Sequence, residues 1–125
     1  MGRPFQFSGR IRSFKYAFRG LGRMLASQHN AWVHAAATIV VIVAGLAFHL
    51  ARGDWAWITL AIVGVWSAEA LNTAFEFLCD VASPEFHPMV EKAKDVAASA
   101  VLLAAIGALV IGVLVFQPYV MRMFR

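Results

Sequence analysis

Four polar residues stand at helical spacing inside a segment of this chain that is otherwise almost entirely apolar. Glu69, Asn72, Glu76 and Asp80 follow one another at intervals of three or four residues, so they share one face of a helix. An ionisable side chain in hydrocarbon costs roughly 2.5–3.5 kcal/mol on insertion scales and usually has a function there. Such acids could bind Mg²⁺ together with substrate phosphates, and a carboxylate deeper in the membrane could accept a proton from a hydroxyl.

A lysine and an aspartate, Lys94 and Asp95, precede the next apolar run. If both runs cross a membrane in opposite directions, this pair meets Glu76 and Asp80 at one membrane boundary. Glu69 then lies deeper in the membrane. A lysine at the boundary could neutralise the charge of a transferring phosphate. The alternative is structural: the two acids pair with Lys94 or with an N-terminal arginine and hold the helices together.

The composition is that of a membrane protein. Of 125 residues, 61% are hydrophobic and 14% are charged, which is a smaller charged fraction than soluble domains carry. Three apolar runs, at about 31–51, 55–78 and 96–120, are each long enough to cross roughly 30 Å of hydrocarbon as a helix. We therefore expect an all-α membrane protein with a single domain, 1–125. The single cysteine, Cys79, excludes a disulfide within the chain.

The segments between the runs predict two different connections. Residues 52–54 predict a tight turn between the first two runs. Residues 80–94 predict a longer polar connection, because Pro84 and Pro88 interrupt helices.

The N-terminal segment is basic and amphipathic. Over about 8–27, apolar residues recur at spacings of three and four, and basic residues occupy the other side. Six of the eleven Lys and Arg residues precede the first apolar run, namely Arg3, Arg10, Arg12, Lys15, Arg19 and Arg23. We expect a surface helix in the membrane interface, with the N-terminus cytoplasmic. The rest of the chain is too apolar for a nucleic-acid-binding protein, and the segment lacks the pattern of a signal peptide.

Other residues have structural interpretations. A stripe of small residues in the third run predicts close helix packing or self-association, and consists of Ala100, Ala104, Ala108 and Gly112. His34 and His49, near the ends of spans, are interpreted as interfacial packing residues, whereas His87 stays an open candidate. The sequence contains no Walker A loop and no kinase glycine-rich loop. Any phosphoryl transfer would therefore use a site unlike those of soluble kinases.

The second apolar run resembles a family signature. Residues 69–80 read EALNTAFEFLCD, and the bacterial integral-membrane diacylglycerol kinase and undecaprenol kinase family carries E-x-[LIVM]-N-[ST]-[AG]-[IV]-E-x-x-V-D. Residues 84–88 and 93–101 resemble a second block of this family, and 13–20 and Asn30-x-x-x-His34 resemble upstream positions. The likeness covers roughly 8–118. It implies a homotrimer whose protomers each have a surface helix and three membrane helices, with active sites between protomers.

The resemblance also implies roles for individual residues. Glu69 would be the general base on a lipid hydroxyl, and Asn72, Lys94 and Asp95 would support catalysis. ATP would be the phosphate donor and Mg²⁺ the cofactor, with Glu76 as a metal ligand and Gln28 and Asp80 as further candidate ligands. The residues implied to line the nucleotide site are Tyr16, Gln28, Glu76, Glu85, Phe86, His87, Lys94 and Asp95. Those implied to contact the lipid are Arg10, Arg12, Glu69 and Ser99.

One position departs from the family pattern in a way that bears on the metal. A second metal-binding glutamate usually stands where this chain has Gln28. A glutamine can coordinate through its carbonyl oxygen, but it brings no negative charge. The number of metal ions therefore stays open.

These observations favour ATP-dependent phosphorylation of a membrane lipid alcohol, giving the lipid monophosphate, in the bacterial cytoplasmic (inner) membrane. Residues 13–18 and 87–98 resemble the undecaprenol kinase branch of the family more closely. This resemblance implies undecaprenol as the acceptor, with diacylglycerol, giving phosphatidic acid, as the alternative. A hypothesis from another class is a small proton-coupled membrane transporter, because an intramembrane glutamate in a short bundle also fits that class. A third is a membrane assembly factor that has lost activity, with Gln28 as the sign. No nucleic acid partner is expected.

Overall fold

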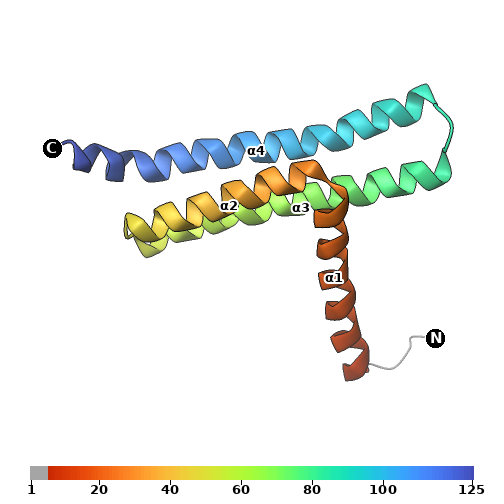
Figure 1. Ribbon diagram of the computed structural model, residues 1–125, viewed down its shortest axis with the longest axis horizontal. Coiled ribbons are helices and arrows are strands. Elements are labelled where there is room, and N and C mark those ends of the chain that lie inside the picture. The colour runs from red at the N-terminus through yellow and green to blue at the C-terminus, as the bar shows by residue number, and fades with distance from the viewer. Residues whose placement is uncertain (1–5) are drawn as a thin grey trace.

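The computed structural model describes residues 6–125, which form four α-helices joined by short connections. These are α1 (Phe7–Ser27), α2 (His29–Ala47), α3 (Arg52–Ala82) and α4 (Pro88–Met123), and no strand occurs in this range. Figure 1 shows α2, α3 and α4 lying along one another, with α1 leaving the group at a steep angle. The predicted all-α architecture is confirmed.

Helices α2, α3 and α4 are each long and apolar enough to cross a membrane. At about 1.5 Å per residue, the 31 residues of α3 and the 36 residues of α4 exceed the roughly 30 Å of a bilayer's hydrocarbon core. The ends of α3 and α4 therefore extend beyond the hydrocarbon. Large apolar side chains are exposed over the outside of these helices, as expected of a surface that faces lipid.

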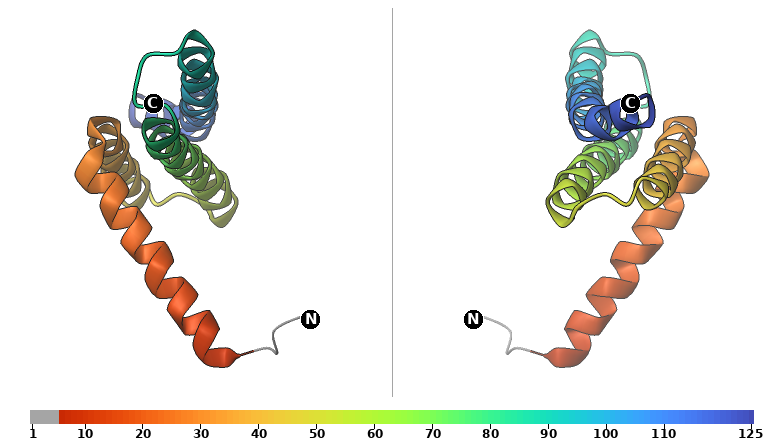
Figure 2. Two further views of the ribbon diagram at one scale, coloured as in Figure 1. Left: turned by 90° about the vertical axis from the view of Figure 1, so that its right-hand side faces the viewer. Right: turned by 90° about the vertical axis from the view of Figure 1, so that its left-hand side faces the viewer.

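Helix α1 is the predicted amphipathic helix, and it stands away from the other three helices along most of its length (Figure 2). Gln28 follows its last residue in an extended conformation, with φ −119° and ψ 117°, and this separates α1 from α2. The indole N–H of Trp32 donates a hydrogen bond to the Leu25 carbonyl oxygen at 2.7 Å. This bond ties the first turn of α2 to the last turn of α1 and fixes the corner between them.

The turn between α2 and α3 lies at residues 48–51, before the predicted position. His49 has φ 53°, in the left-handed region where many helices end. Residues 52–54, predicted to be the turn, form the first turn of α3 instead. The helix dipole stabilises an acidic residue in the first turn of a helix. Asp54 therefore favours a helix that begins at Arg52.

Gly45, in the last turn of α2, allows α2 to approach Trp55 closely. A Cβ atom added at Gly45 would lie 2.6 Å from the Cη2 atom of Trp55. We therefore expect Gly45→Ala to lower the free energy of unfolding by about 1–3 kcal/mol, the usual cost of overpacking. Thermal unfolding in detergent measures this loss. Gly107→Ala is the control, because an added Cβ atom there has no neighbour within 4 Å. A Tm loss in Gly45→Ala no larger than in this control would contradict the close approach.

The connection between α3 and α4 is shorter than predicted, because only residues 83–87 lie outside both helices. Pro88 stands in the first turn of α4, where the missing N–H of proline costs nothing. The His87 Nδ1 atom accepts a hydrogen bond from the Met89 backbone N–H at 3.1 Å and caps the helix. Pro88 therefore begins a helix, although its sequence context predicted a break.

Helix α3 makes most of its interhelical contacts with α4, and a small core closes the end of the bundle that is far from the α3–α4 connection. This core consists of Leu50, Ile58 and Val115. Nearby, the Tyr119 hydroxyl on α4 donates a hydrogen bond to the Asp54 carboxylate on α3. The two long helices are thus joined by packing and by a hydrogen bond at that end.

Not every member of the predicted stripe of small residues packs closely against another helix of the same chain. A Cβ atom added at Gly112, the last member of the stripe, would meet open space, and the same is true at Gly64 on α3. Close backbone approach at these two glycines therefore does not occur within the described part of the chain. Self-association through the stripe stays a prediction.

Candidate active site

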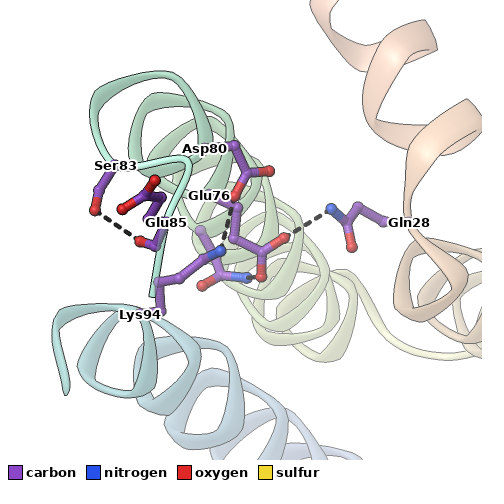
Figure 3. A network of polar contacts seen from close by, with 7 residues as sticks. Gln28, Glu76, Asp80, Ser83, Glu85 and Lys94 are labelled. Atoms are coloured by element: carbon purple, nitrogen blue, oxygen red, sulfur yellow. Dashed lines mark hydrogen bonds and ion pairs between the residues drawn. The ribbon is translucent and has the colours of Figure 1, made fainter. Parts of the chain in front are cut away.

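Five polar side chains lie together where the C-terminal half of α3 meets the α1–α2 corner and the start of α4 (Figure 3). We call this group the polar cluster, and it consists of Gln28, Asn72, Glu76, Asp80 and Lys94. Both oxygens of the Glu76 carboxylate accept hydrogen bonds. Gln28 Nε2 donates to Oε2 at 2.9 Å, and Asn72 Nδ2 donates to Oε1 at 3.2 Å. Residues predicted to share one helix face thus meet partners from other helices there.

Lys94 brings α4 into the polar cluster. Its Nζ atom lies 2.9 Å from Asp80 Oδ1, and the two side chains are 38% and 65% exposed. Figure 3 shows the Lys94 side chain reaching from α4 toward α3. An ion pair this exposed contributes little to stability, because water and salt screen it. The main consequence of the ion pair is therefore that the Lys94 cation lies beside the acids of α3, close to the connection between α3 and α4.

Glu69 lies about two turns before Glu76, roughly 10 Å along the axis of α3, and only 1% of its surface is exposed. Its Oε2 atom is 3.4 Å from Nε2 of His34 on α2, but the two groups are not oriented to form a hydrogen bond. Among residues 6–125, neither Glu69 oxygen nor His34 Nε2 has a hydrogen-bond partner. Buried polar groups are nearly always paired. The arrangement is therefore suited to a ligand that supplies the missing partner.

A cavity of about 290 Å³ lies beside Glu69, between α2, α3 and α4. Its polar wall is formed by Asn30, His34, Glu69 and Asn72, and α4 contributes an apolar wall. Asn72 borders the cavity and also belongs to the polar cluster. A hydroxyl group in this cavity would thus find a buried carboxylate on one side and, past Asn72, the polar cluster on the other. We call this the hydroxyl cavity.

His34 is the functional candidate that interpretation of the sequence missed. Its position near the end of an apolar run indicated interfacial packing, but the structure places it beside Glu69 and in the wall of the hydroxyl cavity. A polar residue inside an apolar run is itself a signal of function, and the resemblance at Asn30-x-x-x-His34 pointed the same way. Nothing in the sequence identifies Glu69 as its neighbour.

Three predicted site residues belong to α1 and are not members of the polar cluster. Arg10, Arg12 and Tyr16 belong to α1, which projects away from the other helices over most of its length (Figures 1 and 2). The Arg19 guanidinium lies over the Tyr16 ring, 5.6 Å from its centre. This part of α1 would have to contact another molecule, or another copy of the chain, to contribute to a site.

Four further predicted site residues lie near the α3–α4 connection, and Ser99 lies one turn beyond Asp95. Glu85, Phe86 and Asp95 are exposed, and the Glu85 backbone oxygen accepts a hydrogen bond from Ser83 (Figure 3). His87 caps α4. The Ser99 hydroxyl donates to the Val96 carbonyl oxygen, within its own helix. These residues lie at or near the end of the bundle at which α3 and α4 are connected.

The polar cluster offers oxygen ligands that suit Mg²⁺, although carboxylates are few. Among residues 6–125, no three His, Cys, Asp or Glu residues group together as a metal site. In phosphate-transfer sites, Mg²⁺ is commonly bound by one or two carboxylates and by the substrate phosphates. Glu76 supplies one carboxylate, and the Asn72 Oδ1 atom is buried without a partner in the described chain. The cluster thus fits an ion that arrives together with the phosphates of a nucleotide.

Comparison with known proteins identifies the family. The family model described as prokaryotic diacylglycerol kinase matches residues 15–116. The chain is 38% identical to an undecaprenol kinase from Bacillus subtilis over 108 residues, covering 86% of this chain and 88% of the relative. The chain belongs to the prokaryotic diacylglycerol kinase family. This confirms the resemblance found at residues 69–80 and makes the protein a membrane-embedded lipid kinase that uses ATP as its phosphate donor.

Relatives within the prokaryotic diacylglycerol kinase family carry two names. A diacylglycerol kinase from Synechocystis is 37% identical over 107 residues, covering 85% of this chain but 61% of the longer relative. A diacylglycerol kinase from Helicobacter pylori is 28% identical over 109 residues, covering 82% of this chain and 85% of the relative. Family membership therefore establishes a kinase acting on a lipid alcohol, and favours it over the transporter and the inactive assembly factor.

Proposed function

We propose that this lipid kinase transfers the γ-phosphoryl group of ATP to the hydroxyl group of undecaprenol, giving undecaprenyl phosphate. The observation that carries the proposal is the Glu69 carboxylate, which is buried beside the hydroxyl cavity and lacks a hydrogen-bond partner within residues 6–125. It lies roughly 10 Å deeper in the bundle than Glu76. A lipid hydroxyl and a water-soluble nucleotide can therefore approach the region between them from opposite directions.

Glu69 is the general base in this proposal. The lipid hydroxyl enters the hydroxyl cavity and gives its proton to the Glu69 carboxylate while its oxygen attacks the γ-phosphorus of ATP. The bond from that phosphorus to the β,γ-bridging oxygen breaks, and ADP leaves. His34 Nε2 lies 3.4 Å from the carboxylate and shares the wall of the hydroxyl cavity with it, and Asn72 lies between the base and the polar cluster.

The polar cluster receives the phosphates. Glu76 and Gln28 would hold Mg²⁺, which neutralises phosphate charge when bound. Lys94, kept in place by Asp80, contacts the transferring phosphate, and Asp95 lies beside it on the exposed start of α4. The other residues proposed to contact the nucleotide are Tyr16, Glu85, Phe86 and His87, and those proposed to contact the lipid are Arg10, Arg12 and Ser99.

The assembly and the membrane orientation are part of the same proposal. Because the first half of α1 projects away from its own bundle, its Tyr16 and arginines can join the site of a neighbouring copy. This supports a homotrimer of single-domain protomers with shared active sites. The polar cluster must face ATP, which places it and the basic α1 on the cytoplasmic side of the inner membrane.

The lipid acceptor is tested by supplying purified protein with radiolabelled ATP and either undecaprenol or diacylglycerol in mixed micelles. We expect kcat/KM for undecaprenol to be at least about tenfold higher, equivalent to about 1.4 kcal/mol of discrimination. Labelled lipid is separated and counted after extraction. A preference for diacylglycerol would contradict undecaprenol as the acceptor. No transfer to either lipid would contradict both the acceptor and the proposed kinase activity.

A further inference from the structure

A cleft lies at the end of the bundle that is far from the polar cluster, between the end of α2 with its following turn and the last turns of α4. Figure 1 shows both segments at that end, opposite the α3–α4 connection. The cleft measures about 610 Å³, within the range of small-ligand pockets. Its lining residues are Ala47, Phe48, His49, Tyr119, Arg122 and Met123. We call it the basic cleft, because the charged residue in its lining is an arginine.

The basic cleft lies at the depth of lipid headgroups. Between Asp95 and Arg122, α4 contains no charged residue. These two residues are about 40 Å apart along the helix, at roughly 1.5 Å per residue. A bilayer measures about 40–45 Å across when both headgroup layers are included. If Asp95 lies in one headgroup layer, Arg122 therefore lies in the other.

The Arg122 guanidinium has a fixed support but no acidic partner. It lies over the Tyr119 ring, 5.4 Å from the ring centre. The Tyr119 hydroxyl donates a hydrogen bond to Asp54 and accepts one from the Ala51 backbone N–H at 3.0 Å, so the ring is held in place. Asp54 is the only Asp or Glu before residue 69, none follows residue 95, and Asp54 does not line the cleft. Arg122 forms no ion pair within residues 6–125, so its N–H donors can bind an anion.

His49 occupies a backbone position that usually belongs to glycine. Its φ is 53°, its N–H donates to the Leu46 carbonyl oxygen, and the Leu50 N–H donates to the Gly45 carbonyl oxygen. These two bonds form a Schellman motif with His49 as the left-handed residue. A residue with a Cβ atom is strained in this conformation, whereas glycine is not. The His49 side chain is exposed and lines the basic cleft, so the strained position adds a polar group to a candidate site.

We propose that the basic cleft binds the phosphate group of an anionic phospholipid, at the membrane surface opposite the active site. Arg122 supplies charge-assisted hydrogen bonds, and the His49 imidazole donates an N–H in either protonation state. Phe48 and Met123 contact the apolar part of the lipid that follows its phosphate. A soluble phosphate would bind the same donors but would leave the exposed Met123 side chain uncovered. A zwitterionic lipid brings its own cation close to its phosphate, so Arg122 attracts it less.

This proposal goes beyond the proposed function, because it concerns the end of the bundle away from Glu69 and involves no phosphoryl transfer. Its test is therefore a binding measurement. Protein in phosphatidylcholine nanodiscs receives a trace of phosphatidylglycerol that carries a diazirine in its headgroup. After irradiation, mass spectrometry identifies the labelled peptides. We expect label on residues 47–49 and 119–123 in wild type, and labelling of the basic helix α1 provides an internal reference.

Arg122→Gln should lower the label on the basic cleft by about tenfold or more relative to α1, because a charge-assisted hydrogen bond is lost. Arg125→Gln is the matched control, since it removes the same charge at the same end of α4 from a residue that does not line the cleft. The label should stay within about twofold of wild type in this control. Equal cleft labelling in wild type and Arg122→Gln would overturn the proposal.

His49→Gly separates lipid binding from folding. Glycine suits the left-handed position better than histidine, so Tm in detergent should equal or exceed that of wild type, while the label on the cleft falls about threefold or more. Unchanged labelling, or a loss of label together with a lower Tm, would overturn the role of His49. Equal labelling by a phosphatidylcholine with the same diazirine would overturn the anionic class. Loss of label on adding sn-glycerol 3-phosphate would overturn a lipid in favour of a soluble phosphate, and cross-links to another copy in place of lipid would overturn the site altogether.

Discussion

Glu69→Gln should lower kcat for lipid phosphorylation by a factor of about 10²–10⁴ and leave KM for ATP close to its wild-type value. The amide has nearly the same shape as the carboxylate but cannot accept the hydroxyl proton. Because Glu69 is 1% exposed and its oxygens have no partner within residues 6–125, water has little access to replace it as a base. Initial rates of label transfer from ATP to undecaprenol measure the effect.

Glu91→Gln is the matched control for Glu69→Gln. Glu91 lies in the first turn of α4, is exposed, and is outside the polar cluster and the hydroxyl cavity. The same change of chemistry there should leave kcat within about twofold of wild type, as for most surface substitutions. Near wild-type kcat in Glu69→Gln, with the control also unchanged, would remove the assignment of Glu69 as the base.

Glu76→Gln should lower kcat/KM for ATP by a factor of about 10² or more, and the loss should shrink as Mg²⁺ is raised. The Glu76 carboxylate accepts hydrogen bonds from Gln28 and Asn72, so replacing it leaves three neutral amides in contact. Such a group has oxygens for a cation but no charge to attract it. Rates measured over a series of Mg²⁺ concentrations at fixed ATP separate this effect from a loss of folding.

Gln28→Glu makes the opposite change at the same place. It adds a second carboxylate next to Glu76, so the Mg²⁺ concentration for half-maximal activity should fall below that of wild type. Glu91→Gln is again the control, because Glu91 is exposed and lies outside the polar cluster. An Mg²⁺ requirement that is the same in wild type, Gln28→Glu and Glu76→Gln would contradict the placement of the metal.

The face of α3 that carries the chemistry could be predicted from sequence alone. Glu69, Asn72 and Glu76 recur at helical spacing within one long apolar run, and that spacing determines which side of the helix they share. The helix ends could not be predicted as well. Asp54 and Pro88 are compatible both with turns and with the first turns of helices, and the choice depends on caps such as His87 that only the folded chain reveals.

The contacts between helices could not be predicted from the sequence. The 3.4 Å approach of His34 to Glu69 joins α2 to α3, and the bond from Gln28 to Glu76 joins the corner between α1 and α2 to α3. The relative rotation of these helices is set by packing. The direction of α1 depends on one extended residue, Gln28, and on the Trp32 hydrogen bond. The hydroxyl cavity depends on all three membrane helices at once. Periodicity describes one helix at a time, so it contains none of this information.

A single-turnover measurement of phosphoryl transfer tests the central proposal most directly, namely that Glu69 accepts the hydroxyl proton while the polar cluster binds the phosphates of ATP. Protein in vesicles containing undecaprenol is loaded with labelled ATP at low Mg²⁺, and transfer is started by adding Mg²⁺ and stopped at intervals. We predict that wild type converts bound ATP into undecaprenyl phosphate, and that Glu69→Gln binds as much ATP but transfers it at least about 10²-fold more slowly. Transfer by Glu69→Gln at the wild-type rate, or loss of its ATP binding, would contradict the account.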